Sequence, residues 1–220
     1  MIKENILRLR GQIPESIAIV AVSKGRIIEQ IKEVIEAGVT EIGENRVQEA
    51  IAKFNALRTM NYKLRTHMVG HLQTNKVKDA LNLFDLIQSV DSLNLAQEID
   101  RQAAKIHKIQ DILIEVKTSH EATKFGLKQD ETVEVIKEMA KLKNINIKGL
   151  MTIAPIVDNP EKTRPYFKTL RILKDKINSL TLTTYPLTLL SMGMTDDFEI
   201  AIEEGSNMVR IGRAIFESAE

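Results

Sequence analysis

The sequence contains no cysteine, and this absence excludes a group of chemistries at once. Disulfides, thiolate nucleophiles, zinc–thiolate sites and iron–sulfur clusters all depend on cysteine sulfur. A net charge of one sign is also missing, because 31 Lys and Arg residues are balanced by 30 Asp and Glu residues. Nucleic acid and anionic membranes attract proteins with a strong positive field, so we expect neither as a partner. Any anion that this chain binds must be held by a local site.

Long hydrophobic runs are missing as well. A membrane-spanning helix needs about 20 consecutive apolar residues, and no run in this chain approaches that length. The first residues carry charges among their apolar positions and indicate an amphipathic helix instead of a signal peptide: MIKENILRLRGQIPES. We therefore expect a cytoplasmic protein. A length of 220 residues with 43% hydrophobic composition fits one domain over 1–220.

The chain alternates short β-branched runs with longer helical patterns. We predict strands, about eight as in the common barrel, at residues 17–23, 39–45, 66–72, 86–92, 111–117, 147–155, 187–194 and 208–216. Thr74, Asp91 or Ser92, and Thr195 are the expected caps of the helices that follow three of these strands. The alternation predicts an α/β fold, a TIM-type (β/α)8 barrel, with an open doubly wound sheet as the alternative.

In such a barrel, functional groups lie at the carboxyl ends of the strands. This rule selects a short list of positions: Lys24, Asn45, His71, Met151 or Thr152, Ser191 with Gly193, and Arg210 with Gly212. Lys24 ends an apolar strand, and burial of a lysine lowers its pKa and frees its amine to attack a carbonyl. The alternative is a lysine that reaches past the rim into solvent.

The last two predicted strands end in glycine-containing runs that favour a phosphate site. Glycine allows an anion to approach backbone N–H groups, and the hydroxyl of Ser191 adds a donor. The alternative is that Gly193 and Gly212 are turn residues only. Barrel closure brings the last strand beside Lys24, so a ligand with a phosphate and an aldehyde, such as pyridoxal phosphate, satisfies both sites. Arg210 lies two residues before Gly212, on the same side of the strand, and could reach the pyridine nitrogen.

Three weaker candidates complete the set. His67 and His71 are four residues apart, but no third ligand accompanies them, and we expect no metal site. His71 is expected to line the cofactor pocket. Glu44 and Asn45 are interpreted either as a loop cap or as polar contacts to the cofactor. Lys117, Glu121 and Lys124 are expected in a solvated loop on the same face.

Six runs resemble the YggS/PROSC family of pyridoxal phosphate homeostasis proteins: AVSK, EIGENRVQEA, GHLQTNK, GLMTIAP, LSMGMTDDFEIAIEEG and VRIGRAIF. The resemblance covers nearly the whole chain. It implies a fold-type III barrel like the N-terminal domain of alanine racemase, with pyridoxal phosphate held as a Schiff base. The implied cofactor contacts are Lys24 for the Schiff base, Arg210 for the pyridine nitrogen, Ser191, Gly212 and Arg213 for the phosphate, and Asn45 nearby. The chain departs from the family at Arg213, where a small hydroxyl residue is common, and at Glu217, where glycine is usual.

The resemblance also bears on catalysis. Racemase-like relatives use a second domain that supplies a tyrosine base, and Tyr62, Tyr166 and Tyr185 of this chain follow no predicted strand. Without a placed acid–base pair we expect no efficient catalysis. The resulting hypothesis is a monomeric carrier or buffer of pyridoxal phosphate that could supply PLP-dependent apoenzymes. The alternatives are an amino-acid racemase-like enzyme and a sugar-phosphate barrel enzyme that uses Lys24 on its substrate.

Overall fold

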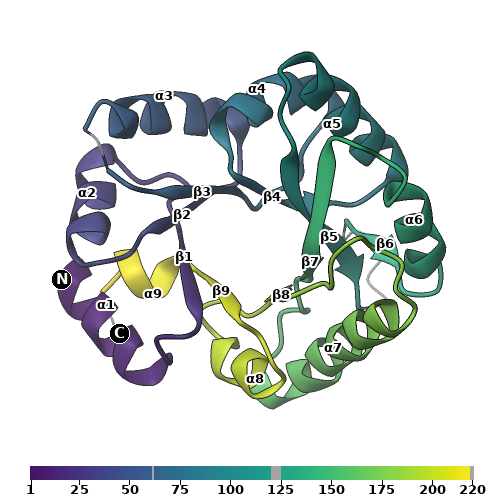
Figure 1. The fold of residues 1–220 in the computed structure, drawn as a ribbon. Coiled ribbons are helices and arrows are strands. Elements are labelled where there is room, and N and C mark those ends of the chain that lie inside the picture. Colours follow the sequence, from purple (N-terminus) through teal and green to yellow (C-terminus); the bar gives the residue numbers. More distant parts are fainter. Residues whose placement is uncertain (61, 120–124, 219–220) are drawn as a thin grey trace.

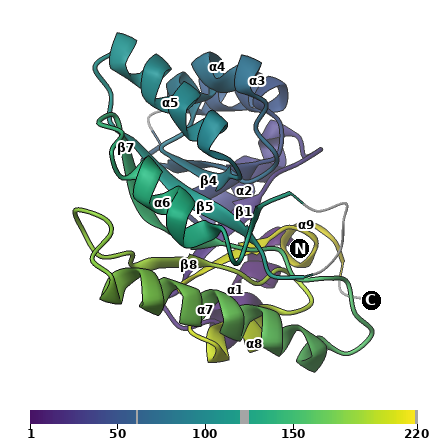
Figure 2. The same cartoon turned by 90° about the vertical axis from the view of Figure 1, so that its right-hand side faces the viewer.

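Parallel strands form a closed ring in the computed structural model, which describes residues 1–60, 62–119 and 125–218. Among these residues the strands pair in the order β4-β3-β2-β1-β9-β8-β7-β5, and a further pairing of β4 with β5 closes the ring. Every pairing is parallel. Figure 1 shows the helices outside this ring, and Figure 2 shows α3–α5 and α7–α8 on opposite sides of it. The predicted TIM-type barrel is confirmed, and the open sheet is excluded.

The strands of the ring are β1 (Ala18–Val22), β2 (Glu41–Glu44), β3 (Arg65–Met68), β4 (Leu86–Val90), β5 (Gln110–Lys117), β7 (Ile145–Met151), β8 (Leu189–Ser191) and β9 (Met208–Ile211). A short strand that we did not predict, β6 (Leu127–Lys128), pairs with the end of β5. The helices are α1 (Ile2–Gln12), α2 (Ile28–Glu36), α3 (Val47–Arg58), α4 (Val77–Leu83), α5 (Leu93–Lys105), α6 (Thr132–Met139), α7 (Arg164–Ser179), α8 (Phe198–Glu203) and α9 (Arg213–Phe216), with 3-10 turns η1 (Thr74–Lys76) and η2 (Pro160–Thr163). None of the described helices combines the length and the apolar character needed to cross a membrane.

Two hydrophobic layers follow from the alternation of side chains along each strand. In β1, Ile19 and Ala21 point outward into the large core between strands and helices. Val20 points inward and joins a small apolar cluster inside the barrel, made of Val20, Val69, Leu86, Leu113, Met151 and Met208. Polar side chains stand two positions along the strands from members of this cluster, as His67 does from Val69 and Arg210 from Met208. The barrel interior therefore combines an apolar cluster with polar side chains on both sides of it.

The predicted strands end too late on the functional side of the barrel. β3 stops at Met68 instead of Leu72, and β7 stops at Met151 instead of Pro155. The last predicted strand is divided, because Gly212 leaves the extended conformation and the short helix α9 follows it. The reason is that apolar loop residues such as Val69 and Ile153 line a cavity, and a sequence pattern cannot distinguish them from strand residues.

Two of the three predicted helix caps are wrong. Thr74 is the first residue of η1, not a cap, and α8 begins at Phe198 after Asp197, so Thr195 does not cap it. Asp197 instead accepts a 2.6 Å hydrogen bond from the backbone N–H of Met194, which fixes the loop before the helix. The third cap is confirmed, because the Ser92 hydroxyl accepts a hydrogen bond from the N–H of Leu95.

Gly149 should be irreplaceable in the closed ring. A Cβ at this position would lie 1.9 Å from the backbone oxygen of Leu189, so β7 and β8 could not keep their present distance. We expect Gly149→Ala to lower the free energy of unfolding by about 1–3 kcal/mol, the usual cost of overpacking, in urea titrations followed by circular dichroism. Gly11→Ala is the matched control, because no atom lies within 4 Å of a Cβ there, and alanine should stabilise a helix by roughly 0.5–1 kcal/mol. Equal stability of the two variants would contradict the close approach.

Candidate functional site

Two cavities open where the strands of the barrel end, and Asn45 lines both of them. The larger one, which we call the Arg210 cavity, has a volume of 610 Å³ and is lined by Val22, Asn45, Val69, Ile153, Thr195, Arg210, Gly212 and their neighbours. The smaller one, the Lys24 cavity, has a volume of 440 Å³ and is lined by Lys24, Asn45, Arg46, His71, Gln73, Lys76 and others. Both cavities lie in the region that is selected by the rule that barrels place their sites at strand ends.

Lys24 lies in a tight turn directly after β1. The N–H of Arg26 donates to the backbone oxygen of Ser23, and Gly25 adopts a φ of +68°, which a residue with a Cβ rarely does. The N–H of Gly25 also donates to the carboxylate of Glu49. Of the two alternatives left open for Lys24, the structure has the lysine at the rim, because its side chain is exposed and lines the Lys24 cavity. The turn directs the lysine outward, as in the rim alternative.

A buried polar triad holds this turn. The carboxylate of Glu44 is fully buried and accepts hydrogen bonds from the Ser23 hydroxyl at 2.6 Å and from Lys53 Nζ at 2.7 Å. Lys53 also donates to the backbone oxygen of Ser23 at 2.7 Å. Ser23, Glu44 and Lys53 thus fix the residue before Lys24 to both β2 and α3. Glu44 serves the turn, and its neighbour Asn45 is the residue of that pair that reaches the cavities.

Asn45 presents an unused acceptor to the site. Its side-chain Oδ1 is buried and forms no hydrogen bond with any residue that the structure describes. A buried polar atom without a partner is costly in a folded protein, so a ligand that donates to it would be favoured. This position fits the predicted role of Asn45 as a contact residue.

Arg210 is the charged group of the larger cavity. It is 4% exposed, and its Nη1 donates to the Ser191 hydroxyl at 2.7 Å while its Nη2 donates to the backbone oxygen of Thr152 at 2.8 Å. Burial lowers the pKa of Arg210 to about 10, although the charges of Glu115 and Asp197 oppose this effect. The guanidinium remains protonated at neutral pH and is held by neutral acceptors. Its remaining donors are available at the cavity wall.

Ser191 does not line either cavity. Its hydroxyl is fully buried beneath them, where it donates to Gln88 Oε1 at 2.6 Å and accepts from Arg210. Thr195, four residues later, does line the Arg210 cavity, and its Oγ1 accepts from the N–H of Ala214 at 3.3 Å. Sequence reasoning missed Thr195 as a site residue because it assigned this threonine to a helix cap. A second hydroxyl in the run SMGMT was the available signal.

Gly212 and Arg213 both line the Arg210 cavity, as predicted for a shared site. Gly212 packs beside Val22, the last residue of β1, since a Cβ built on it would lie 3.6 Å from the Val22 oxygen. The side chain of Arg213 forms an exposed ion pair with Asp196, so its charge is directed to a neighbouring carboxylate at the cavity mouth. Glu217 likewise forms an exposed ion pair, with Arg26.

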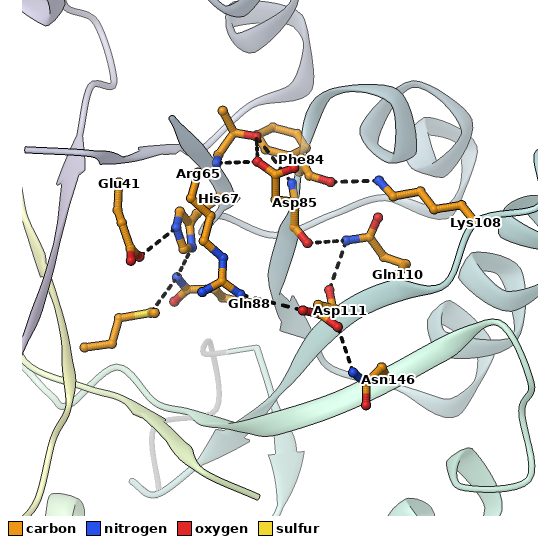
Figure 3. A network of polar contacts seen from close by, with 12 residues as sticks. Glu41, Arg65, His67, Phe84, Asp85, Gln88, Lys108, Gln110, Asp111 and Asn146 are labelled. Atoms are coloured by element: carbon orange, nitrogen blue, oxygen red, sulfur yellow. Dashed lines mark hydrogen bonds and ion pairs between the residues drawn. The ribbon is translucent and has the colours of Figure 1, made fainter. Parts of the chain in front are cut away.

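The two histidines of the HMVGH run lie in different environments. His71 stands at the rim, 3.0 Å from Asp91, and its ring stacks on Phe125 with centroids 3.8 Å apart. His67 is fully buried inside the barrel beside Glu41 and Gln88 (Figure 3). Among the described residues no group of His, Asp and Glu is arranged to hold a metal ion. Of the predicted loop residues, Glu121 and Lys124 lie outside the described residues.

Glu115 is a buried carboxyl group that the sequence reasoning missed and whose charge acts on Arg210, although it lines neither cavity. It is 6% exposed near the end of β5, in a run that is otherwise largely apolar. Burial and the charge of Asp91 raise the pKa of Glu115 to about 7, although Arg210 acts in the opposite direction. A carboxylic acid inside a predicted barrel strand was the signal, because such a group is rarely buried without a specific environment.

Comparison with known proteins agrees with this geometry. The family model of the alanine racemase N-terminal domain matches residues 1–219. A pyridoxal phosphate homeostasis protein of Aquifex aeolicus is 45% identical over 190 residues, which are 86% of this chain and 81% of that protein. The pyridoxal phosphate homeostasis protein of Escherichia coli K12 is 34% identical over 94% of this chain and 87% of its own length.

Solved structures with a similar fold are also known. PipY of Synechococcus elongatus, in a structure described as having PLP bound, superposes with a TM-score of 0.91 at 35% identity, over 98% of this chain and all of that one. The alanine racemase of Clostridium difficile superposes with a TM-score of 0.82 at 20% identity, and the match covers 56% of that enzyme. The second likeness concerns the fold alone.

The elevated pKa of Glu115 makes a prediction about stability and pH. The folded carboxyl binds its proton more tightly than the unfolded one, with a pKa of about 7 against an ordinary 4.5. Between these values the folded state binds more protons, so the free energy of unfolding should fall as the pH rises from 4.5 to 7. Over this range we expect the free energy of unfolding of the wild type to fall by an amount on the order of 1–3 kcal/mol. Glu115→Gln should not show this fall in urea unfolding at several pH values.

Glu134→Gln is the control for this experiment, because Glu134 is an exposed glutamate on α6. Its pH profile should follow that of the wild type. If the Glu115→Gln profile followed it as well, Glu115 would be ionised throughout this range and its environment would be more polar than the barrel interior implies.

Proposed function

The chain belongs to the YggS/PROSC family of pyridoxal phosphate homeostasis proteins, and from this membership we propose that it binds pyridoxal 5′-phosphate in the Arg210 cavity with Lys24 as its covalent anchor. The observation that carries the proposal is the buried Arg210 guanidinium, which lines a cavity whose wall includes the end of β1, the strand that leads to Lys24. The apolar side chains of Val22, Val69 and Ile153 line the same cavity and suit an aromatic ring.

Arg210 suits the pyridine nitrogen of the cofactor. A guanidinium is a donor only and keeps its protons, so a nitrogen that accepts from it remains unprotonated. An unprotonated ring is a weaker electron sink than one paired with an acid. The unused acceptor of Asn45 suits a donor group of the cofactor, and a hydroxyl substituent on the ring is such a group.

The anchor requires a movement of Lys24 only. Pyridoxal phosphate supplies an aldehyde that condenses with a lysine amine to form a Schiff base with loss of water. Lys24 is exposed and lines the Lys24 cavity, and Asn45 lines both this cavity and the Arg210 cavity. We infer that the side chain turns past Asn45 while the triad of Ser23, Glu44 and Lys53 keeps the backbone fixed.

For the phosphate we infer a site at Gly212, Arg213 and Thr195. These residues line one side of the Arg210 cavity, beside the end of β1. The Thr195 oxygen accepts from Ala214, and the hydroxyl proton has no acceptor among the described residues, so it can donate to a phosphate oxygen. The predicted contribution of Ser191 is in this view indirect, because its hydroxyl holds Arg210.

We further propose a role as carrier or buffer of the cofactor instead of a catalyst. The relatives are named for homeostasis. All three tyrosines of the chain, Tyr62, Tyr166 and Tyr185, belong to the described residues, and none lines either cavity. An acid–base catalyst must lie within hydrogen-bond reach of the reacting atom, and the base of a racemase is therefore missing from these walls. The proposal includes a monomer of one domain in the cytoplasm, with PLP-dependent apoenzymes as recipients.

Lys24→Ala tests the anchor. We expect the purified wild type to show the visible absorption band of lysine-bound pyridoxal phosphate, and the variant to lose it, because no other amine would form the bond in the Arg210 cavity. Lys76→Ala is the matched control, since Lys76 also lines the Lys24 cavity and should leave the band unchanged. A band that persists in Lys24→Ala would assign the anchor elsewhere, and Lys24-dependent turnover of an amino acid faster than with free cofactor would make the protein an enzyme.

Thr195→Val and Thr195→Ser test the phosphate site. Valine removes the donor, and we expect the dissociation constant for pyridoxal phosphate to rise about tenfold, as for the loss of one hydrogen bond to a charged group. Serine retains the hydroxyl and should bind like the wild type. Equal affinities of the valine and serine variants in fluorescence titrations would exclude the Thr195 hydroxyl from the phosphate site.

A further inference from the structure

A continuous line of polar side chains crosses the barrel interior and ends on Arg210. It passes through Glu41 on β2, His67 on β3, Gln88 on β4 and Ser191 on β8. His67, Gln88 and Ser191 are each fully buried, and Arg210 is 4% exposed. Figure 3 shows the first part of the line, with His67 between Glu41 and Gln88. The cofactor site therefore connects to a set of residues that lie too deep in the barrel to contact a ligand.

The donors and acceptors of this line follow from its two ends. His67 Nε2 lies 3.0 Å from Glu41 Oε2, a contact within ion-pair distance that lacks hydrogen-bond geometry, and because a carboxylate can only accept, we infer that Nε2 carries the ring proton. His67 Nδ1 is then an acceptor and faces the amide nitrogen of Gln88 at 2.9 Å. The Gln88 oxygen consequently points to Ser191, whose hydroxyl donates to it at 2.6 Å. With its proton used, the Ser191 oxygen accepts from Arg210 Nη1 at 2.7 Å.

The charges around His67 keep this order at neutral pH. Burial lowers the pKa of His67, although Glu41 and Asp85 act in the opposite direction, so the ring is neutral. Burial would raise the pKa of Glu41, but its contact with His67 and the charges of Arg65 and Arg10 outweigh this effect and lower it. A neutral imidazole beside an ionised carboxylate has its single proton on the nitrogen that faces the carboxylate. Glu41, which can only accept, and Arg210, which can only donate, thus favour the same direction from the two ends of the line.

We propose that Glu41, His67 and Gln88 are positioning residues that orient the Ser191 hydroxyl and so hold Arg210 with its free donors toward the pyridine nitrogen of the cofactor. The inference rests on the proposed function for the identity of the ligand, but the order of the hydrogen bonds exists without it. Ser191 and the backbone oxygen of Thr152 fix two edges of the guanidinium. Without the Gln88 oxygen as acceptor, the Ser191 hydroxyl proton could turn toward Arg210. Both groups would then be donors, and the hydrogen bond that holds Arg210 would be lost.

The barrel also supplies a matched control for this line. Gln110 is another fully buried glutamine, on the neighbouring strand β5, and Figure 3 shows it in the same polar region. Its amide donates to the backbone oxygens of Asp85 and Asp111 at 2.9 and 3.0 Å, and it contacts neither Ser191 nor Arg210. Gln88→Leu and Gln110→Leu therefore each remove one buried glutamine amide. Only the first change affects the line that ends at Arg210.

The first experiment reads the order of the line in the cofactor-free protein. Long-range ¹H–¹⁵N spectra distinguish the two neutral forms of a histidine ring, and the His67 signal can be assigned by its loss in His67→Gln. We expect the proton on Nε2 in the wild type. Glu41→Gln can donate to the ring, so the proton should move partly or wholly to Nδ1. A wild-type ring that is charged at neutral pH, or protonated on Nδ1, would overturn the proposed direction.

The second experiment reads the effect on the cofactor. We expect Gln88→Leu to raise the dissociation constant for pyridoxal phosphate about tenfold, as for a weakened hydrogen bond to a charged group, and to shift the visible absorption maximum of the bound cofactor. Gln110→Leu should leave both values as in the wild type, even if its thermal stability falls as far. Gln88→Glu keeps the acceptor for Ser191 and should restore affinity and spectrum, with a second proton on His67.

The outcomes separate this inference from the proposed function. Equal behaviour of Gln88→Leu and Gln110→Leu, with a wild type that binds the cofactor, would overturn the positioning role and leave the proposed function standing. A wild type that binds no pyridoxal phosphate would overturn both. The ring proton of His67 would still show which way the hydrogen bonds run.

Discussion

The open end of this barrel is organised around one buried positive charge. Arg210 stands on β9 with almost no exposed surface, and a charge in such a place must be compensated by the protein around it. The compensation is divided. Ser191 and Thr152 accept hydrogen bonds directly, whereas Glu115 and Asp197 act on the guanidinium through their charge. Because no carboxylate among the described residues forms an ion pair with Arg210, part of its donor capacity remains for a ligand.

Two glutamates of the barrel, the partly exposed Glu41 and the buried Glu115, illustrate how the same residue type takes different roles. Glu41 lies 3.0 Å from the imidazole of His67, and its pKa is lowered. Burial, together with the charge of Asp91, raises the pKa of Glu115 to about 7. The first can be a fixed acceptor that directs a line of hydrogen bonds. The second changes its charge near neutral pH and so makes the field at Arg210 depend on protonation.

Much of the architecture could be predicted from the sequence, because barrels obey a simple positional rule. The alternation of strands and helices indicated the fold, and the strand ends included Lys24, Asn45, His71, Arg210 and Gly212, all of which line one of the two cavities. The direction of individual side chains was less accessible. Ser191 ends β8 and Thr195 follows four residues later in a loop, and only the folded structure shows that the first is buried inside the barrel and the second lines the cavity.

The positioning residues Glu41, His67 and Gln88 could not be predicted from the sequence for a related reason. Gln88 and Ser191 are separated by 103 positions in the sequence, and Gln88 stands in a strand whose pattern suggested nothing but burial. A hydrogen bond over such a separation arises from closure of the barrel, which brings β4, β8 and β9 to one interior space. No local pattern encodes it. Sequence reasoning could identify the groups at the rim, whereas the groups that support them from below follow only from the closed ring.

The two supports of the site differ in stiffness, and this difference bears on the proposed role. Arg210 is held inside the barrel by partners that are themselves buried. Lys24 is different, because the triad of Ser23, Glu44 and Lys53 fixes its backbone but leaves the side chain exposed. A ligand bound between them meets a preorganised recognition group and an anchor that must lose side-chain entropy each time it binds. In the proposed role, this combination of a fixed recognition group and a mobile anchor would join specific binding with release of the cofactor, as a carrier requires.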